Sequence, residues 1–367
     1  MDRIILHIDV NSAFLSWSAL KLIRQGYKKD IRKEVAVIAG DPNKRHGVVV
    51  AASIPAKKLG IKVPTNLFEA RKIYKNIIVV KPDMKFYKLC SRALMTFLKK
   101  IFSKVEQFSI DECFVEYTPL KSKYGDEVIF ANKLKDEIYR RFGFTVNIGI
   151  GNNKLCAKMA SDFEKPNKVH TLYDFEFKDK VWNKDISELF MAGKASCTKL
   201  RSLGINTIKD LATYDENILI KKLKSHGKLL HEYANGIDNS KLNVDSYDER
   251  KSISYSKTLD ISTSNEEKLK ELLNTFSKKI SLELKERKLF AKTVVVTIRD
   301  DEFKTTSKQE KLINYSNEDI DIYNLGLKIF DKLWNGNKVR LIGLGVSDLN
   351  NYYFYQCTIE DFLEEIY

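Results

Sequence analysis

The stretch FSIDECF, residues 108–114, decides the fold because it sets two carboxylates side by side between two apolar runs. Those runs are typical of the arms of a β-hairpin, with Ser109 to Glu112 at its tip. Neighbours in a straight strand face opposite sides of a sheet, so Asp111 and Glu112 converge only where the strand turns or bulges. Two acids at one tip repel, and a shared cation would relieve that repulsion. An isolated Asp-Glu pair also fits an exposed acidic turn, so other features must distinguish the two readings.

The composition indicates a basic protein of several domains. The 367 residues are too many for one ordinary core. Lys and Arg total 63 against 49 Asp and Glu, and the net charge of +14 favours a polyanionic partner, nucleic acid before a membrane surface or an acidic protein. The five cysteines are scattered and never form a C-x-x-C pair, which predicts neither a zinc site nor a disulfide framework. No apolar stretch approaches membrane length, so we expect a cytoplasmic protein without a membrane partner.

The first part of the chain predicts a mixed β and α unit. A buried strand is expected over residues 3–10 with a helix directly after it, so Asp9 stands at the C-terminal end of a strand. The elements expected next are strands 33–40 and 46–53, helix 54–60, strand 76–82, helix 84–103, the hairpin, helix 126–142, strand 144–151 and helix 152–166. This order predicts an antiparallel or mixed sheet with helices on one face.

The second part of the chain predicts a helical region, a linker and a separate small domain. Short helical patterns dominate from about residue 170 to 245, and the polar stretch 243–252 is typical of a linker. The elements expected after it are strand 253–260, helix 265–288, strands 291–300 and 302–309, helix 319–335 and strand 338–349. Their β-α-β-β-α-β order is that of an independent domain.

Three carboxylates, Asp9, Asp111 and Glu112, form the candidate catalytic group. They can meet on one sheet if their strands are neighbours. Carboxylates without a His or Cys ligand set suit hard cations such as Mg²⁺ or Mn²⁺. Such a site can hold two metal ions, one to lower the pKa of an attacking hydroxyl and one to grip a triphosphate. For Asp9 alone, the plain alternative is an N-cap of the following helix.

Four blocks follow one another along nearly the whole chain: HIDVNSAF (7–14), SIDECF (109–114), NIGIGNNKLCAKMASDFEKP (147–166) and ANGID (234–238). Together they resemble the Y-family translesion DNA polymerases, and within them the bacterial UmuC-like and DinB-like branch. The resemblance implies an α+β multidomain polymerase right hand with a ferredoxin-like palm, small fingers, a helical thumb with a degenerate helix-hairpin-helix and a β-α-β-β-α-β little finger. The implied domains are palm 1–12 and 82–168, fingers 13–81, thumb 169–242, linker 243–250, little finger 251–350 and a C-terminal tail 351–367.

The resemblance also assigns roles within the catalytic group. It implies that Asp9 and Asp111 bind both of two Mg²⁺ ions, with Mn²⁺ as an alternative ion. Glu112 would complete the group, and Val10 would offer only its backbone carbonyl.

Two further residues would contact the incoming dNTP. Phe14 would be a steric gate, an exposed ring under the sugar that clashes with a 2′-hydroxyl; by its pattern alone it is a helix core residue. Lys165 would contact the triphosphate; by its pattern alone it is a solvated helix end.

The chain departs from the family in two places. Ile54 and Lys57 stand where the fingers usually carry a Tyr and an Arg that hold the β and γ phosphates, which implies weaker nucleotide binding. In the thumb, the Gly-x-Gly whose backbone N–H groups touch DNA phosphates has become Met191-Ala192-Gly193. The residues expected to bind DNA are Gly193, Lys194, Lys199, Gly227, Lys228, Lys251 and Ser252. The tail carries Gln356, Ile359 and Phe362 at spacings loosely like a sliding-clamp peptide, and an ordinary amphipathic helix is the alternative.

The function expected from these features is template-directed DNA synthesis opposite damaged bases, on primer-template DNA with dNTPs and without proofreading. One rival is a catalytically weak or inactive DNA-binding or scaffolding relative, against which the complete carboxylate group argues. Another is a different two-metal nucleotidyl-transfer or cyclisation enzyme, which the thumb and little-finger blocks disfavour because a cyclase holds no duplex.

Overall fold

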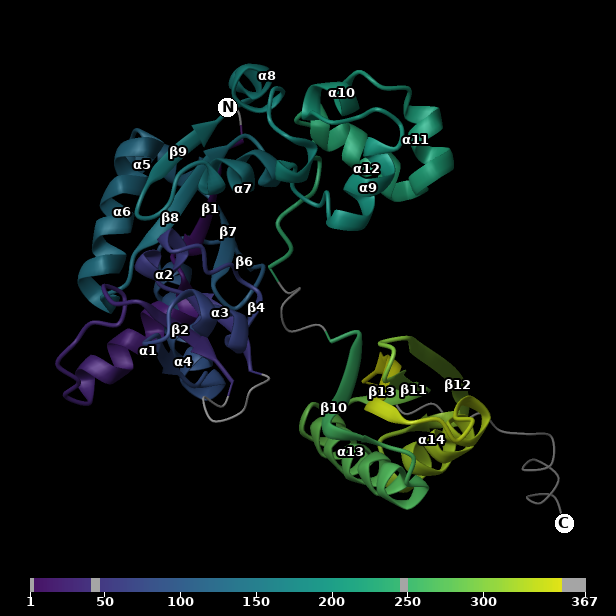
Figure 1. Ribbon diagram of the computed structural model, residues 1–367. Coiled ribbons are helices and arrows are strands. Elements are labelled where there is room, and N and C mark those ends of the chain that lie inside the picture. Colours follow the sequence, from purple (N-terminus) through teal and green to yellow (C-terminus); the bar gives the residue numbers. More distant parts are fainter. Residues whose placement is uncertain (1–2, 41–46, 245–249, 352–367) are drawn as a thin grey trace, which may run out of the picture. The chain divides into compact units, whose positions relative to one another are not determined.

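The computed structural model describes residues 3–40, 47–244 and 250–351, and the chain forms two compact units, Met1–Tyr247 and Asp248–Tyr367 (Figure 1). The first unit contains two sheets and the second contains one, and each unit has its own hydrophobic core. The α+β multidomain fold expected from the sequence is confirmed. Within the described ranges, no helix is long and apolar enough to cross a membrane.

The central sheet of the first unit has the strand order β6-β7-β1-β8-β9. Its strands are β1 Ile5–Val10, β6 Val105–Gln107, β7 Glu112–Glu116, β8 Val146–Gly151 and β9 Val169–Leu172. The β8–β9 pair is parallel and the other pairs are antiparallel, so the sheet is mixed as expected.

Strand β1 is buried along its whole length because helices cover both faces of this sheet. Leu6, Ile8 and Val10 face a core that includes residues of α4 (Met84–Lys99) and α6 (Glu127–Phe142). The intervening residues of β1 face α7 (Lys154–Asp162), where Ile5 packs with a residue of that helix. The expectation of helices on one face is therefore wrong, since α7 follows β8 closely enough to fold back onto the opposite side.

A smaller sheet of the first unit has the order β4-β3-β2-β5. Its elements are β2 Ala36–Ala39, β3 Val48–Ala52, α2 Ile54–Lys58, β4 Thr65–Asn66, α3 Leu67–Ile73 and β5 Ile78–Val80. Helix α1, Ala13–Arg24, leads from the central sheet and packs on β2 and β3. The elements β4 and α3 were not predicted.

Short helices make up the last part of the first unit. They are α8 Asp174–Val181, α9 Lys194–Arg201, α10 Ile208–Ala212, α11 Glu216–Leu223 and α12 Ser225–Ala234, with a 3-10 turn at Ile186–Glu188. Between the hairpin and α6 lie another 3-10 turn, Thr118–Leu120, and α5, Lys121–Tyr124. The helical character expected from about residue 170 onward is thus confirmed after β9.

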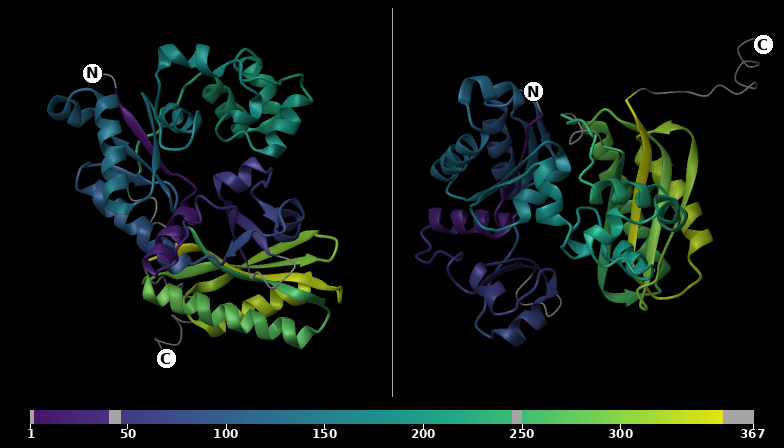
Figure 2. Two further views of the ribbon diagram at one scale, coloured as in Figure 1. Left: turned by 60° about the vertical axis from the view of Figure 1, so that its left-hand side comes forward. Right: turned by 90° about the horizontal axis from the view of Figure 1, so that it is seen from above.

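The second unit has the expected β-α-β-β-α-β order. Its elements are β10 Ser252–Thr263, α13 Glu266–Glu286, β11 Phe290–Asp300, β12 Thr305–Ser316, α14 Asp319–Leu333 and β13 Val339–Asn350. The strands form an antiparallel sheet in the order β10-β13-β11-β12. Both helices cover the same face of it (Figures 1 and 2).

Candidate active site

Asp9 and Glu112 are direct partners across the β1–β7 ladder. Opposed residues of an antiparallel pair point to the same face, so both side chains lie on the face that α7 covers. The N–H of Val10 donates to the carbonyl of Asp111 at 3.0 Å, which brings the third residue to the same strand end. Asp9 is not an N-cap, because it lies inside β1 and the N-cap position of α1 is Ser12.

Asp111 lies in a bend just before β7, outside the regular ladder. The hydroxyl of Ser109 donates to its Oδ1 at 2.7 Å and fixes the carboxylate. Burial, together with the charges of Asp9 and Glu112, raises the pKa of Asp111. Asp9 is only 8% exposed and the other two are half-buried. The exposed acidic turn is therefore excluded, and the three carboxylates share one partly enclosed negative site.

Glu112 is held by two side chains that the sequence did not single out. Its Oε2 lies 3.1 Å from Nε2 of His7 and 2.8 Å from Nζ of Lys158 on α7. Burial alone would raise the pKa of Glu112, but the hydrogen bonds from His7 and Lys158 lower it to about 2. Nδ1 of His7, in turn, lies 2.8 Å from the hydroxyl of Ser161 on the same helix. Helix α7 thus fixes this carboxylate in its charged form.

Lys165 follows α7 and contacts the carboxylate of Asp9; its ammonium also lies 2.8 Å from Asp162. As the side chains stand, no three Asp, Glu, His or Cys groups among the described residues gather closely enough to hold a metal ion. The positive charge next to these carboxylates comes from Lys158, which contacts Glu112, and from Lys165, which contacts Asp9. The chemistry of the donors nevertheless fits a hard divalent cation, because the three acidic side chains offer carboxylate oxygens. Burial raises the pKa of Asp111, and the nearby charges of Asp9 and Glu112 raise it further.

Phe14 lies in the first turn of α1 and is half-buried rather than exposed. Its ring stacks on Tyr87 of α4 with a centroid distance of 4.7 Å and an interplanar angle of 11°. It also lies 6.2 Å from the ring of Trp17. The ring is packed against two hydrophobic clusters, and part of its surface stays exposed at the start of α1, five positions after Asp9.

Lys57 comes within reach of the site through the start of α1. Its Nζ donates to the hydroxyl of Ser12 at 3.3 Å, three residues after Asp9. Ile54 opens α2 and is exposed. The structure thus brings Lys57 towards the catalytic face, whereas Ile54 offers an aliphatic surface.

The residues expected to bind DNA in the helical region are mostly exposed. Gly193 is the N-cap of α9, and Lys194 and Lys199 project from that helix. Met191 has φ 69°, the left-handed conformation that glycine adopts most easily. The turn therefore keeps a glycine-like backbone even though the first glycine is replaced.

Gly227 has a packing reason of its own. A Cβ at this position would lie 2.4 Å from the carbonyl oxygen of Leu219, so only glycine lets α12 approach α11 this closely. Its N–H donates to the backbone carbonyl of Lys224, and its role in DNA binding stays a prediction. Lys228 is exposed.

The other predicted contacts lie in the second unit or beyond the described chain. Lys251 and Ser252 are exposed at the start of β10. Gln356, Ile359 and Phe362 lie outside the described residues.

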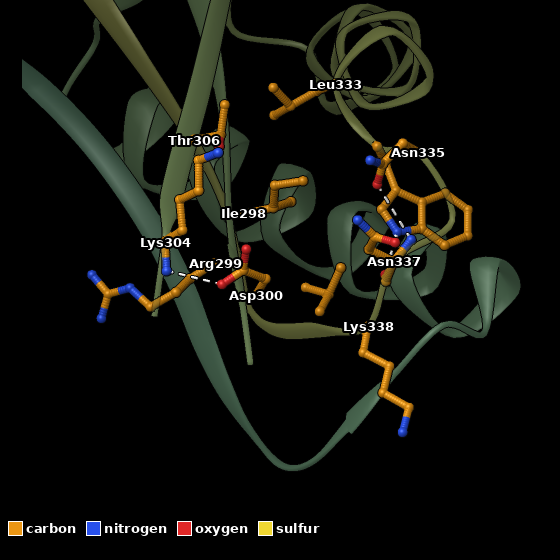
Figure 3. A pocket seen from close by; sticks show the side chains of 11 residues that line it. Ile298, Arg299, Asp300, Lys304, Thr306, Leu333, Asn335, Asn337 and Lys338 are labelled. Atoms are coloured by element: carbon orange, nitrogen blue, oxygen red, sulfur yellow. Dashed lines mark hydrogen bonds between the residues drawn. The ribbon is translucent and has the colours of Figure 1, made fainter. Parts of the chain in front are cut away.

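A separate pocket of about 140 Å³ lies where β11 passes to β12, and it includes none of the predicted site residues (Figure 3). Its Asp300 accepts a hydrogen bond from the backbone N–H of Lys304 at 2.9 Å.

Sequence reasoning missed the residues that support the carboxylates, although one signal was available. His7 stands two positions before Asp9 in a strand and must share its face. Asn147 is the partner of Asp9 on its other side, in β8. That pairing follows from sheet topology, so the sequence alone could not reveal it.

Comparison with known proteins shows which family the chain belongs to. Residues 8–162 match the model of the impB/mucB/samB family, and residues 250–357 match that of the impB/mucB/samB family C-terminal domain. DNA polymerase IV of Clostridium acetobutylicum is 44% identical over 350 residues, which cover 95% of this chain and 88% of that protein. This chain belongs to the Y family of DNA polymerases. DNA polymerase IV 1 of Bacillus subtilis is 31% identical and covers 95% of this chain.

A solved structure supports the same fold. The Y-family DNA polymerase chimera Dbh-Dpo4(243-245)-Dbh superposes with a TM-score of 0.80 at 23% identity, over 94% of this chain and 98% of the chimera. At that identity the likeness supports the fold alone. The polymerase fold expected from the four sequence blocks is thus confirmed, together with the family.

Proposed function

We propose that this chain is a template-directed DNA polymerase that inserts dNTPs opposite damaged bases. The observation that carries the proposal is the meeting of Asp9, Asp111 and Glu112 on one face of the central sheet, in a chain of this family. The relatives from Clostridium acetobutylicum and Bacillus subtilis bear the names DNA polymerase IV and DNA polymerase IV 1, and they align over nearly all of the chain. An inactive relative finds no support, because the carboxylate group is complete and enclosed.

Divalent metal dependence belongs to this family, and we propose two Mg²⁺ ions held by Asp9 and Asp111, with Mn²⁺ as an alternative. Glu112 and the backbone carbonyl of Val10 complete the site. The chemistry that such ions supply is activation of the primer 3′-hydroxyl and neutralisation of the triphosphate. His7 and Lys158 keep the Glu112 carboxylate charged and oriented.

Three residues receive the nucleotide in this proposal. Lys165 contacts the triphosphate, and its ammonium is already held beside Asp9. Lys57 supplies a second charge as a point contact, without the two-pronged grip of an arginine. Phe14 presents the exposed part of its ring to the sugar and excludes a 2′-hydroxyl.

DNA is proposed to lie against exposed basic groups and backbone. In the thumb these are Gly193, Lys194, Lys199, Gly227 and Lys228, and at the start of the little finger Lys251 and Ser252. The proposed domains remain palm 1–12 and 82–168, fingers 13–81, thumb 169–242, linker 243–250 and little finger 251–350. Clamp binding through Gln356, Ile359 and Phe362 and a cytoplasmic location remain predictions.

Asp111→Ala tests the proposal directly. The variant should lose nucleotide addition by at least about a thousandfold, since it loses metal ligation, while duplex affinity stays within about twofold because no DNA contact is removed. Primer extension on undamaged and abasic templates, paired with fluorescence anisotropy on the same duplex, measures both. Extension near the wild-type rate would show that Asp111 is not part of the catalytic site.

A further inference from the structure

The segment that carries Lys165, residues 164–168, has little apolar packing to fix its backbone. Residues 164–168 between α7 and β9 are all exposed. Lys165 is nevertheless held with its ammonium on Asp9. Something other than hydrophobic burial must therefore fix the backbone on either side of Lys165.

Asn147 supplies the first part of that fixation. It is fully buried in β8 and lies directly opposite Asp9 in the β1–β8 ladder. Its Nδ2 donates to the carbonyls of Ser161 at 3.0 Å and Glu164 at 2.6 Å. Its Oδ1 accepts from the backbone N–H of Lys168 at 3.2 Å. The side-chain amide of Asn147 thus forms hydrogen bonds with the backbone both before and after Lys165.

Asn11 supplies the second part and is itself buried at the end of β1. Its Nδ2 donates to Oδ1 of Asn147 at 3.0 Å. Its Oδ1 accepts from the backbone N–H of Asn167 at 2.9 Å, a residue in the left-handed conformation with φ 62°. The two amides form one connected network in which each oxygen and each nitrogen has a partner.

We infer that Asn147 and Asn11 are positioning residues that present Lys165 to the triphosphate of the incoming nucleotide. The inference rests on the proposed function, in which Lys165 contacts that triphosphate. The amides hold four backbone groups between the end of α7 and the start of β9, namely the carbonyls of Ser161 and Glu164 and the N–H groups of Asn167 and Lys168. Asn147 does so from the position opposite Asp9 in β8, and Asn11 from just after the end of β1. A rigid turn lowers the entropy that Lys165 loses when it grips a phosphate.

The inference predicts a selective loss of nucleotide binding. Asn147→Ala should raise the KM for dNTP at least about tenfold while kcat falls less than about threefold, because a phosphate contact acts in ground and transition states alike. Lys165→Ala should show the same pattern. In the double variant the KM should rise no more than about twofold beyond that of Lys165→Ala, since both changes remove one contact.

Asn153→Ala is the matched control. Asn153 is a buried amide at the other end of α7, where it accepts from Cys156 and donates to the carbonyl of Gly236 at 2.8 Å. Its loss loosens the helix without touching the segment around Lys165, so the KM for dNTP should stay within about twofold. Thermal melts of all variants verify folding, and Asn11→Ala carries the same test if Asn147→Ala does not fold.

The outcomes separate the inference from the proposed function. If Lys165→Ala raises the KM and the effect of Asn147→Ala multiplies with it in the double variant, the amides do not act through Lys165 and the inference is overturned. If Lys165→Ala leaves the KM unchanged in an active polymerase, the phosphate role of Lys165 is wrong and the inference falls with it. A wild-type protein that adds no nucleotide would overturn the proposed function itself.

Discussion

The ring of Phe14 is partly packed and partly exposed. One side stacks on Tyr87 and joins the core between α1 and α4. The ring also packs against a second cluster that includes Leu15 and Ala19, and part of its surface stays exposed at the start of α1. The sequence offered a core residue or an exposed gate as alternatives, and the half-buried ring combines features of both. Its two effects can be separated by measurement, because stability and sugar selection are different quantities.

Phe14→Ala should lower stability and relax sugar selection together. Loss of the packed part of the ring should lower the free energy of unfolding by about 1 to 3 kcal/mol, less than truncation of a fully buried phenylalanine would. Loss of the exposed part of the ring should raise kcat/KM for rNTP relative to dNTP on the order of tenfold or more. Phe97→Ala is the control, since Phe97 is also half-buried at the edge of this core and packs on Phe142. A sugar preference unchanged in Phe14→Ala, or equally relaxed in Phe97→Ala, would rule out the gate.

Met191 is a non-glycine residue in a backbone conformation that favours glycine. A non-glycine residue at φ 69° costs roughly 1 kcal/mol or more, and Met191 adopts that angle before α9. Met191→Gly should therefore raise the melting temperature by about 1 to 3 °C, after the added freedom of the unfolded chain is subtracted. Met84→Gly is the control, because Met84 is equally exposed but starts helix α4. Met84→Gly should lower the melting temperature. A similar fall for Met191→Gly would show that the backbone at Met191 is not strained.

The sequence could predict which carboxylates come together but not which side chains hold them. Asp9, Asp111 and Glu112 follow from a strand end and a hairpin tip, both of which are local patterns. Lys158 reaches Glu112 only because α7 folds back over β8 and β1, which no spacing along the chain encodes. Tertiary contacts of this kind depend on topology, so the side chains that hold the carboxylates could be identified only in the structure.

Strand β8 and helix α7 form the element that brings this support to the site. On the face of β8 towards α7 stand Asn147, Gly149 and Gly151, while Ile148 and Ile150 face the opposite core. A Cβ on Gly149 would lie 2.0 Å from the carbonyl oxygen of Ala157. The alternation of glycine and isoleucine therefore lets the helix lie directly on the strand.

Gly149→Ala should disrupt that packing. The added methyl group has no space, so the helix must move and the free energy of unfolding should fall by at least about 3 kcal/mol. Gly193→Ala is the matched control: at φ −69° and with no atom within 4 Å of its Cβ, it should cost less than about 1 kcal/mol. Urea unfolding followed by tryptophan fluorescence measures both. Equal stability of Gly149→Ala and the wild type would contradict the close approach.

Long elements with a strong pattern were predictable, whereas the short elements β4 and α3 were not. The order of the second unit follows from alternating strands and two long amphipathic helices. The two-residue strand β4 has no periodicity to read, and α3 after it starts at a capping residue, Asn66, whose side chain accepts from the N–H of Phe68. Its position depends on pairing with β3, a contact that the local sequence does not specify.

At the scale of the whole molecule, the net charge of +14 is the property that bears most on DNA binding. Contacts to phosphates release counterions, so the affinity for duplex DNA should fall steeply with salt and depend little on sequence. A protein that neutralises several phosphates loses on the order of a thousandfold in affinity or more between about 50 and 200 mM salt. The slope of log Kd against log salt counts the contacts.

Removing two proposed phosphate contacts should change that slope by a defined amount. In Lys194→Ala/Lys199→Ala the slope should decrease in magnitude by roughly two, because each lysine lost from a phosphate contact removes about one. The control is Lys88→Ala/Lys133→Ala, which removes the same charge from exposed positions on α4 and α6, the helices on the face of the central sheet opposite Asp9. Its slope should stay near that of the wild type, since general attraction changes little when two of 63 basic residues are lost. Fluorescence anisotropy with a primer-template duplex at several salt concentrations gives both slopes. Equal slopes for the two double variants would mean that α9 does not contact the DNA backbone, and that the duplex is held by charge spread over the whole surface.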